Sequence, residues 1–135
     1  MATILAHIRV HEGAEERFEG LARSLVTDTE AVEPHCRRYE YWRAAEPRLY
    51  YCLLAFDDFH GFLEHQTSDH HESASPKLGE LIEDIRLEWV DPIQGASPLP
   101  STNMQDVPEG ASELTRTYHK IFAARIQDWW LKQRS

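Results

Sequence analysis

The feature that most limits the fold of this chain is the change of hydrophobic period along its first 90 residues. Apolar side chains recur at every second position over residues 3–10, which is typical of a strand with one buried face. They recur at helical spacing over residues 14–31, which predicts a helix that ends before Pro34. Later segments repeat both patterns, as strands over residues 36–42, 49–56 and 85–90 and as helices that begin near Phe59 and at Pro76. This order of elements predicts an α+β fold of the ferredoxin-like, split βαβ type, with a four-stranded antiparallel sheet and helices on one face.

Helix-start signals support the two helices in the second half of this region. Asp57 and Asp58 precede a short amphipathic stretch and suit the capping position of a helix. Ser75 and Pro76 form a cap followed by proline, which is a common first helical residue. We therefore expect one helix to end in the histidine-rich stretch at residues 65–71 and the next to begin at Pro76. Ser68 and Asp69 can also cap the turn that follows them, which places His70 and His71 at a helix start.

The face of the sheet without helices is expected to be apolar. If Ile4, Ala6 and Ile8 of the first strand face the core, Leu5 and His7 lie on this uncovered face. Some of four aromatic residues are expected beside them: Tyr39, Tyr41, Trp42 and Trp89. An uncovered aromatic face predicts association with a second copy, so we expect a homodimer.

The composition divides the chain into three parts. Residues 1–97 hold the predicted α+β domain, and residues 98–111 are rich in Pro, Gly and small polar residues, as in a linker. Residues 112–135 repeat apolar residues at helical spacing with Lys and Arg opposite, which predicts one amphipathic helix. Its two tryptophans need a cover, either on the same domain or across a dimer.

Charge and hydropathy exclude several classes of partner. The formal net charge of −9 argues against nucleic acid, which is bound by clustered Lys and Arg. No apolar run approaches the roughly 18 residues that span a bilayer, so no membrane partner is expected. The N-terminal residues lack the features of a secretory signal, and these observations predict a cytoplasmic protein.

The two cysteines are expected to be free thiols. If residues 36–42 and 49–56 form a hairpin, Cys52 lies opposite about Tyr41 and is offset from Cys36 by roughly 17 Å. This separation is far beyond the reach of a disulfide. Free thiols suit a reducing compartment.

Motifs for metal, nucleophilic and cofactor chemistry are weak. His60, His65 and His70 are spaced by five residues and cannot share one face of a helix, so no metal site is expected. No nucleophile elbow is present and the six glycines are scattered, so we expect no dinucleotide cofactor. An enzyme with this sequence would depend on acid–base residues and a shaped apolar pocket.

Three segments resemble the antibiotic biosynthesis monooxygenase (ABM) domain family. They are Tyr39–Trp42 (YEYW), Leu49–Asp58 (LYYCLLAFDD) and Phe62–His71 (FLEHQTSDHH). The resemblance covers about residues 2–97. It implies a dimeric α+β barrel and oxidation of phenolic or quinol-like substrates by O2 without metal, flavin or haem. Haem-degrading relatives use an asparagine on the first strand, whereas the only asparagine here is Asn103.

The resemblance implies a base and an aromatic-lined cavity, and the residues suggest candidates for both. We expect His65 and His70 to be catalytic, because imidazole has the unperturbed pKa that best suits a base near neutral pH. His71, beside Glu72, is expected at the surface. Four residues are candidates for substrate binding: His7, Trp42, Tyr51 and Trp89. Two alternatives remain open at this point, a non-catalytic dimeric module that binds a small ligand and a histidine-dependent isomerase or signal-degrading enzyme.

Overall fold

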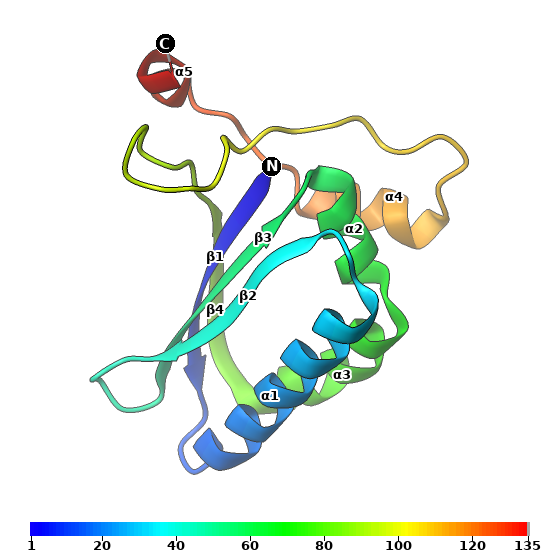
Figure 1. Ribbon diagram of the computed structural model, residues 1–135. Helices are drawn as coiled ribbons and strands as arrows, with labels where there is room; N and C mark the ends of the chain where they lie inside the picture. Colours follow the sequence, from blue (N-terminus) through cyan, green and yellow to red (C-terminus); the bar gives the residue numbers. More distant parts are fainter. Residues whose placement is uncertain (135) are drawn as a thin grey trace.

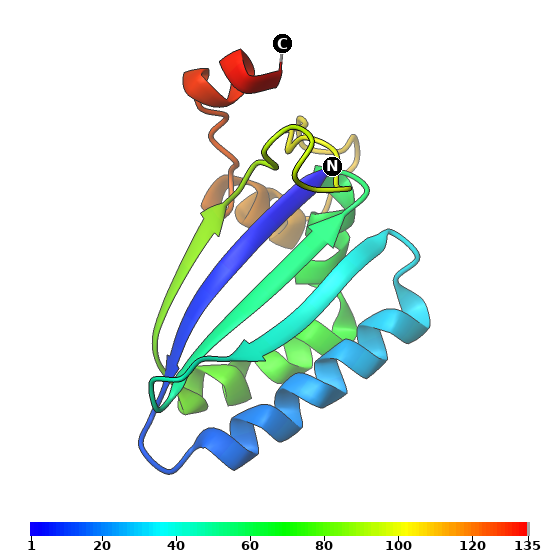
Figure 2. The same ribbon diagram turned by 60° about the vertical axis from the view of Figure 1, so that its left-hand side comes forward.

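The computed structural model describes residues 1–134, which form a four-stranded antiparallel sheet with a layer of helices on one face (Figure 1). The elements in chain order are β1 (Ala2–Val10), α1 (Glu15–Val32), β2 (Cys36–Arg43), β3 (Leu49–Phe56), α2 (Phe59–Thr67), α3 (Asp69–Leu81), β4 (Ile82–Trp89), α4 (Glu113–Ile121) and α5 (Asp128–Arg134). The strand order is β2-β3-β1-β4, and Figure 2 shows the strands side by side in front of α1. The predicted α+β, ferredoxin-like class is therefore confirmed.

Strand register gives the sheet two different faces. Ile4 and Ala6 of β1 pair with Leu54 and Cys52 of β3, and all four are buried beneath the helices. The intervening residue Leu5 lies on the opposite face and is only partly buried. Because side chains alternate along a strand, every residue of the sheet is assigned to one face by this register.

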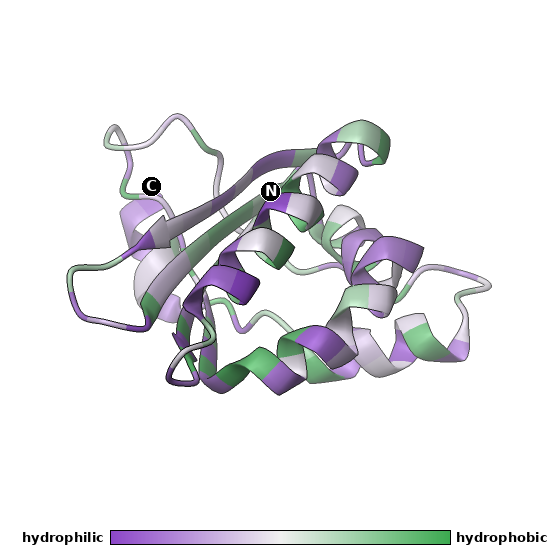
Figure 3. Ribbon diagram, turned by 90° about the horizontal axis from the view of Figure 1, so that it is seen from below, coloured by the Kyte–Doolittle hydropathy of each residue, from purple (hydrophilic) through white to green (hydrophobic). Residues whose placement is uncertain are grey.

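The helix layer buries one stripe of α1, as its sequence pattern predicts. Phe18, Ala22, Leu25 and Thr29 of this helix are buried. Hydrophobic and hydrophilic residues alternate around the helical ribbons in Figure 3, as expected for helices with one side on a core. The core of the molecule therefore lies between α1, α2, α3 and the sheet.

The helix start predicted at Pro76 is wrong, whereas the cap predicted at Ser68 is confirmed. Ser68 caps this helix by accepting a hydrogen bond from the backbone nitrogen of His71 at 3.3 Å, so the helix begins at Asp69 and Pro76 lies inside it. Proline removes one helical hydrogen bond, but its φ angle is compatible with a helix. The earlier cap and the burial of Ala74 and Leu81 on the same helix stabilise a continuous helix through this position.

The predicted single C-terminal helix is two helices, α4 and α5, separated by residues 122–127. Phe122, just after α4, packs against Phe62 of α2 with ring centroids 5.7 Å apart. Arg134 of α5 donates to Asp91 at 2.6 Å, near the end of β4. Figure 1 shows α4 and α5 in different parts of the molecule, joined by an extended stretch of chain. Ser135, the last residue of the predicted helix, lies outside the described residues.

The expected linker, residues 98–111, is held against the domain by hydrogen bonds. Thr102 is fully buried and its hydroxyl donates to the carbonyl of Val90 at 2.6 Å. The backbone nitrogen of Asn103 donates to the carbonyl of Met1 at 2.9 Å. This segment carries the chain from β4 across the start of β1 to α4.

Both cysteines are free thiols in the described chain, and Cys52 lies opposite Tyr41, as the predicted hairpin requires. Among the described residues, no helix combines the length and the apolar character needed to cross a membrane.

Candidate functional site

A cavity of about 670 Å3 lies between the helix-covered face of the sheet and helices α2, α3 and α4. Its floor is largely apolar and comes from Ala6, Ile8, Leu54, Ile85 and Leu87. Tyr39, Tyr41, Cys52, His65 and His71 add polar groups to the wall. A mostly apolar cavity of this size with a few polar groups is typical of a site for a small organic molecule. We call it the central cavity.

His65 is a buried histidine in the wall of the central cavity. It projects from α2, is 0% exposed, and its Nδ1 lies 3.0 and 3.1 Å from the two carboxylate oxygens of Glu33. Glu33 is the residue that ends α1. A carboxylate accepts hydrogen bonds only, so it holds the ring proton on Nδ1 and leaves the lone pair of Nε2 available. This Nε2 is buried and has no hydrogen-bond partner among the described residues.

His71 is a second imidazole in the cavity wall, although we expected it at the surface. Its ring centroid is 4.9 Å from that of His65, and its Nδ1 is buried without a partner in the described chain. Burial, with a smaller effect from His65, lowers the pKa of His71 to about 4. His71 is therefore neutral near pH 7. The neighbouring Glu72, which suggested exposure, instead accepts a hydrogen bond from Tyr118.

His70 lies outside the central cavity. Its Nε2 is 2.8 Å from Oε1 of Glu33 and 3.1 Å from the hydroxyl of Thr29. It lines a separate hollow of about 540 Å3 between α1 and the junction of α2 with α3, which we call the outer hollow. The two histidines predicted to be catalytic are thus joined through Glu33 but face different spaces.

None of the four residues predicted to bind substrate lines the central cavity. His7, Tyr51 and Trp42 form a row across the uncovered face of the sheet, because Trp42 pairs with Tyr51 and Tyr51 pairs with His7. Trp42 is 61% exposed, and the rings of His7 and Tyr51 meet edge to face at 5.2 Å. Trp89 lies on the helix side but packs into the core against Phe62, and its Nε1 donates to a backbone carbonyl.

Two tyrosines that precede Trp42 on β2 face the cavity instead. Tyr39 and Tyr41 of β2 have their hydroxyls 3.0 Å apart, and the ring of Tyr39 is 5.1 Å from that of His65. Burial raises the pKa of both phenols and of the Cys52 thiol well above their usual values. These groups are therefore protonated donors. Tyr41 and Trp42 are consecutive residues of β2, so they lie on opposite faces of the sheet. The sequence did not reveal which of the two faces the helices.

Helix α4 supplies the remaining wall of the cavity through Tyr118 and Phe122. The hydroxyl of Tyr118 donates to Oε1 of Glu72 on α3 at 2.5 Å. The backbone carbonyl of Phe122 accepts the hydrogen bond from Trp89 at 2.9 Å. These contacts attach the C-terminal extension to the domain and close the central cavity on one side.

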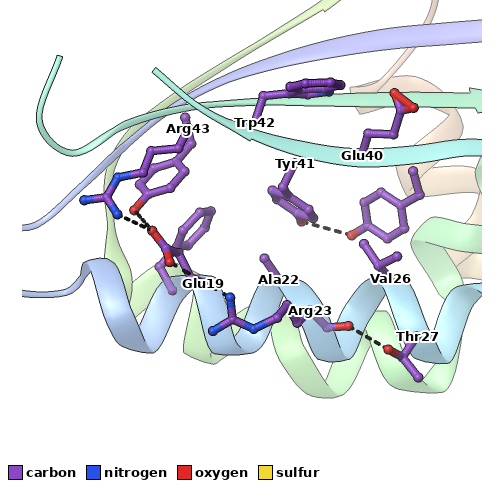
Figure 4. A pocket seen from close by; sticks show the side chains of 12 residues that line it. Glu19, Ala22, Arg23, Val26, Thr27, Glu40, Tyr41, Trp42 and Arg43 are labelled. Carbon is purple, nitrogen blue, oxygen red and sulfur yellow. Dashed lines mark hydrogen bonds and ion pairs between the residues drawn. The ribbon is translucent and has the colours of Figure 1, made fainter. Parts of the chain in front are cut away.

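A third space, a groove of about 680 Å3, lies between α1 and β2 (Figure 4). Figure 4 shows Tyr41 directed from β2 toward α1, while Trp42 lies on the other side of the strand. The polar groups of the groove already pair with each other: Glu19 accepts from Tyr50 at 2.6 Å and from Arg43 at 3.1 Å. No free base comparable to His65 lies there, so the central cavity is the better candidate site.

The architecture defines a ferredoxin-like α+β domain with a histidine-bearing cavity of the size of a small organic molecule. The chain belongs to the antibiotic biosynthesis monooxygenase family, whose model matches residues 1–77. This match contains β1 through most of α3, and therefore Glu33, His65 and His71. Helix α4 and its cavity residues lie beyond it.

Solved structures share the fold. A Caulobacter crescentus protein provisionally assigned to the antibiotic biosynthesis monooxygenases superposes with a TM-score of 0.65 at 21% identity, covering 68% of this chain and 89% of that chain. A Mycobacterium tuberculosis protein gives 0.64 at 21% identity, covering 71% and 98%. A Shewanella oneidensis protein gives 0.62 at 28% identity, covering 66% and 87%. No curated protein matches the chain.

Proposed function

We propose that the protein is a cofactor-independent monooxygenase that oxidises an electron-rich aromatic or quinol-like small molecule in the central cavity. The observation that carries the proposal is His65: a buried imidazole whose Nδ1 is engaged by Glu33 and whose Nε2 is unpartnered at an apolar cavity. This is the arrangement of a general base held in one tautomer by a carboxylate. Membership of the family supports the same class of reaction.

The proposed reaction begins when a substrate hydroxyl, or an acidic C–H next to a carbonyl, gives its proton to Nε2 of His65. The hydroxyls of Tyr39 and Tyr41 are protonated and hydrogen-bonded to each other, so the hydroxyl that accepts within the pair can donate its proton to the resulting oxyanion and stabilise it. The electron-rich anion passes one electron to O2, and the radical pair combines to form a C–O bond. The peroxide anion takes the proton back from Nε2 of His65, which restores the base. Loss of water from the hydroperoxide then leaves a carbonyl, so that one oxygen atom enters the product and the other enters water.

Dimerisation through the uncovered face of the sheet is part of this proposal. In a single chain the helices cover only the other face of the sheet. On the uncovered face Leu5, Leu53 and Tyr51 are partly buried, and Trp42 is largely exposed. This apolar group of side chains, bordered on the same face by Glu40, Arg86 and Glu88, favours association. Pairing two such faces would place a central cavity on each outer side of the dimer.

The function is tested by oxygen uptake with metal-stripped protein and a panel of phenols, quinols and anthrone-like compounds. We expect uptake with at least one compound, and a loss of about 100-fold or more in His65→Gln, as is usual when a general base is removed. His35→Gln is the matched control, because His35 is exposed and contacts Asp57 away from the cavity. An unchanged rate in His65→Gln would contradict the assignment. Turnover that continues without oxygen would favour the isomerase alternative.

A further inference from the structure

The carboxylate of Glu33 and the imidazoles of His65 and His70 come together where the end of α1 meets the junction of α2 and α3. Glu33, His65 and His70 each offer one ligand atom, and these atoms all lie within 4.8 Å of one another. Nδ1 of His65 is 3.0 Å and Nε2 of His70 is 2.8 Å from the carboxylate oxygens of Glu33. The three side chains come from the end of α1, from α2 and from the start of α3.

These distances suit a transition-metal ion. Zinc is bound at about 2.0–2.2 Å by imidazole nitrogen and carboxylate oxygen, so two ligands of one ion lie roughly 2.9–3.4 Å apart. Both imidazole–carboxylate distances are close to this range. The partly exposed ring of His70 lines the outer hollow, which gives an ion access to the cluster.

The electrostatic surroundings attract a cation. The outer hollow is lined by Asp28, Glu64 and Asp69 in addition to Glu33, and no Lys or Arg lines it. Two imidazoles and a carboxylate form a donor set typical of Zn2+, Fe2+, Co2+ and other divalent transition metals, rather than of Mg2+ or Ca2+, which prefer oxygen ligands alone.

We propose that Glu33, His65 and His70 bind one divalent transition-metal ion at the wall of the outer hollow. Coordination of Nδ1 of His65 moves the ring proton to Nε2, because a neutral imidazole carries a single N–H proton. No proton is released from His65 in this change. The ion would thus remove the free lone pair from the central cavity, and this second consequence, inhibition, rests on the proposed function.

The test measures Zn2+ binding to chelator-treated protein by competition with a chromophoric chelator, and Co2+ binding by its visible absorption. We expect one ion per chain. His70→Ala should weaken Zn2+ binding by more than about tenfold. Loss of a residue that only supports a metal ligand already weakens binding about tenfold, and loss of a ligand should weaken it further. Glu33→Gln keeps the side-chain size and should weaken it as well. His11→Ala is the control, since His11 is exposed and distant in sequence from the cluster.

Equal Zn2+ affinity in wild type, His70→Ala and Glu33→Gln, with thermal unfolding showing that all are folded, would overturn the site. Inhibition of oxygen uptake should follow Zn2+ occupancy in the wild type and require higher Zn2+ concentrations in His70→Ala. Zn2+ that binds at the cluster without inhibiting would overturn the proton shift. Zn2+ binding by a protein that oxidises nothing would contradict only the proposed function, and oxidation without Zn2+ binding only the metal site.

Discussion

At the scale of single residues, Glu33 decides what His65 can do. Its carboxylate accepts from Nδ1 of His65 and contacts Nε2 of His70, so it connects the central cavity with the outer hollow. The same carboxylate holds the tautomer that a base requires and completes the proposed metal site. Proton and metal ion compete for the same nitrogen of His65.

Glu33→Gln tests the positioning role. An amide can donate to Nδ1 of His65 and so place the ring proton on Nε2, the wrong position for a base. We expect kcat to fall by about 100-fold or more with little change in KM, as for a triad whose carboxylate becomes an amide. Nitrogen-15 shifts of the His65 ring report the tautomer directly. Wild-type kcat together with an unchanged tautomer would show that Glu33 has no such role.

His71 predicts a pH dependence of stability. Its pKa is about 4 in the folded protein and about 6.5 when unperturbed. Between these values the unfolded chain binds a proton that the folded chain does not, so stability falls as pH decreases from about 6.5 to about 4. The full loss is of the order of 3 kcal/mol.

His71→Gln should remove this contribution. Urea unfolding of wild type and variant at several pH values between 4 and 7 measures the contribution of His71 to the free energy of unfolding. In the difference between the two proteins, the contributions of carboxylates that titrate in both cancel. Parallel curves for the two proteins would mean that burial of His71 does not affect its protonation.

The sequence indicated the histidine-rich stretch at residues 65–71 but not the position of each histidine in it. His65 and His71 lie in the wall of the central cavity, whereas His70, which we expected to be catalytic, lines the outer hollow. The spacing argument against a metal treated His65 and His70 as members of one helix. The chain turns at Ser68, and the third group, Glu33, comes from a distant element that no local pattern indicates.

At the scale of elements, α4 is the addition that completes the cavity. The hydrogen bond from Tyr118 to Glu72 attaches it to α3, and Phe122 packs on α2. An element that lies outside the family match therefore shapes the central cavity.

Tyr118→Phe removes the hydroxyl and keeps the ring. The lost hydrogen bond should cost about 1 kcal/mol. Amide hydrogens of α4 should then exchange about fivefold faster, while those of β1 and β3 stay unchanged. Tyr51→Phe, on the opposite face of the sheet, is the matched control. Exchange in α4 that does not respond would show that this bond does not hold the helix.

Element boundaries illustrate which signals a sequence carries. The strands and α1 followed from alternation and helical spacing, because burial on one face imposes a period. The start of α3 did not follow from a local pattern, because Ser68 and Pro76 are both plausible helix starts. Tertiary packing selects Ser68. The break between α4 and α5 depends on two distant anchors, Phe62 and Asp91, and has no local signal.

At the scale of the whole molecule, the uncovered sheet face predicts a dimer. Leu53→Asp places a charge at the centre of this face, where Leu53 pairs with Leu5 and Glu40. We expect sedimentation to show a dimer for wild type and a monomer for the variant. Val32→Asp introduces the same charge at a 66% exposed position of α1 and should leave the dimer intact. A wild-type protein that sediments as a monomer would contradict the proposal.

The overall topology was predictable because the order of strands and helices leaves few ways to build one sheet. The face on which each aromatic residue lies was not predictable for β2. Trp42 and Tyr41 are neighbours of similar character, and the choice between them depends on pairing with β3.

The walls of the central cavity include both Ala6 and Phe122. During synthesis, the complete wall of this cavity therefore cannot form until Phe122 has emerged from the ribosome. Until then, the apolar surface of α2 that later packs against Phe122 stays uncovered, and a product terminated before α4 would keep that surface exposed and lack one wall of the cavity.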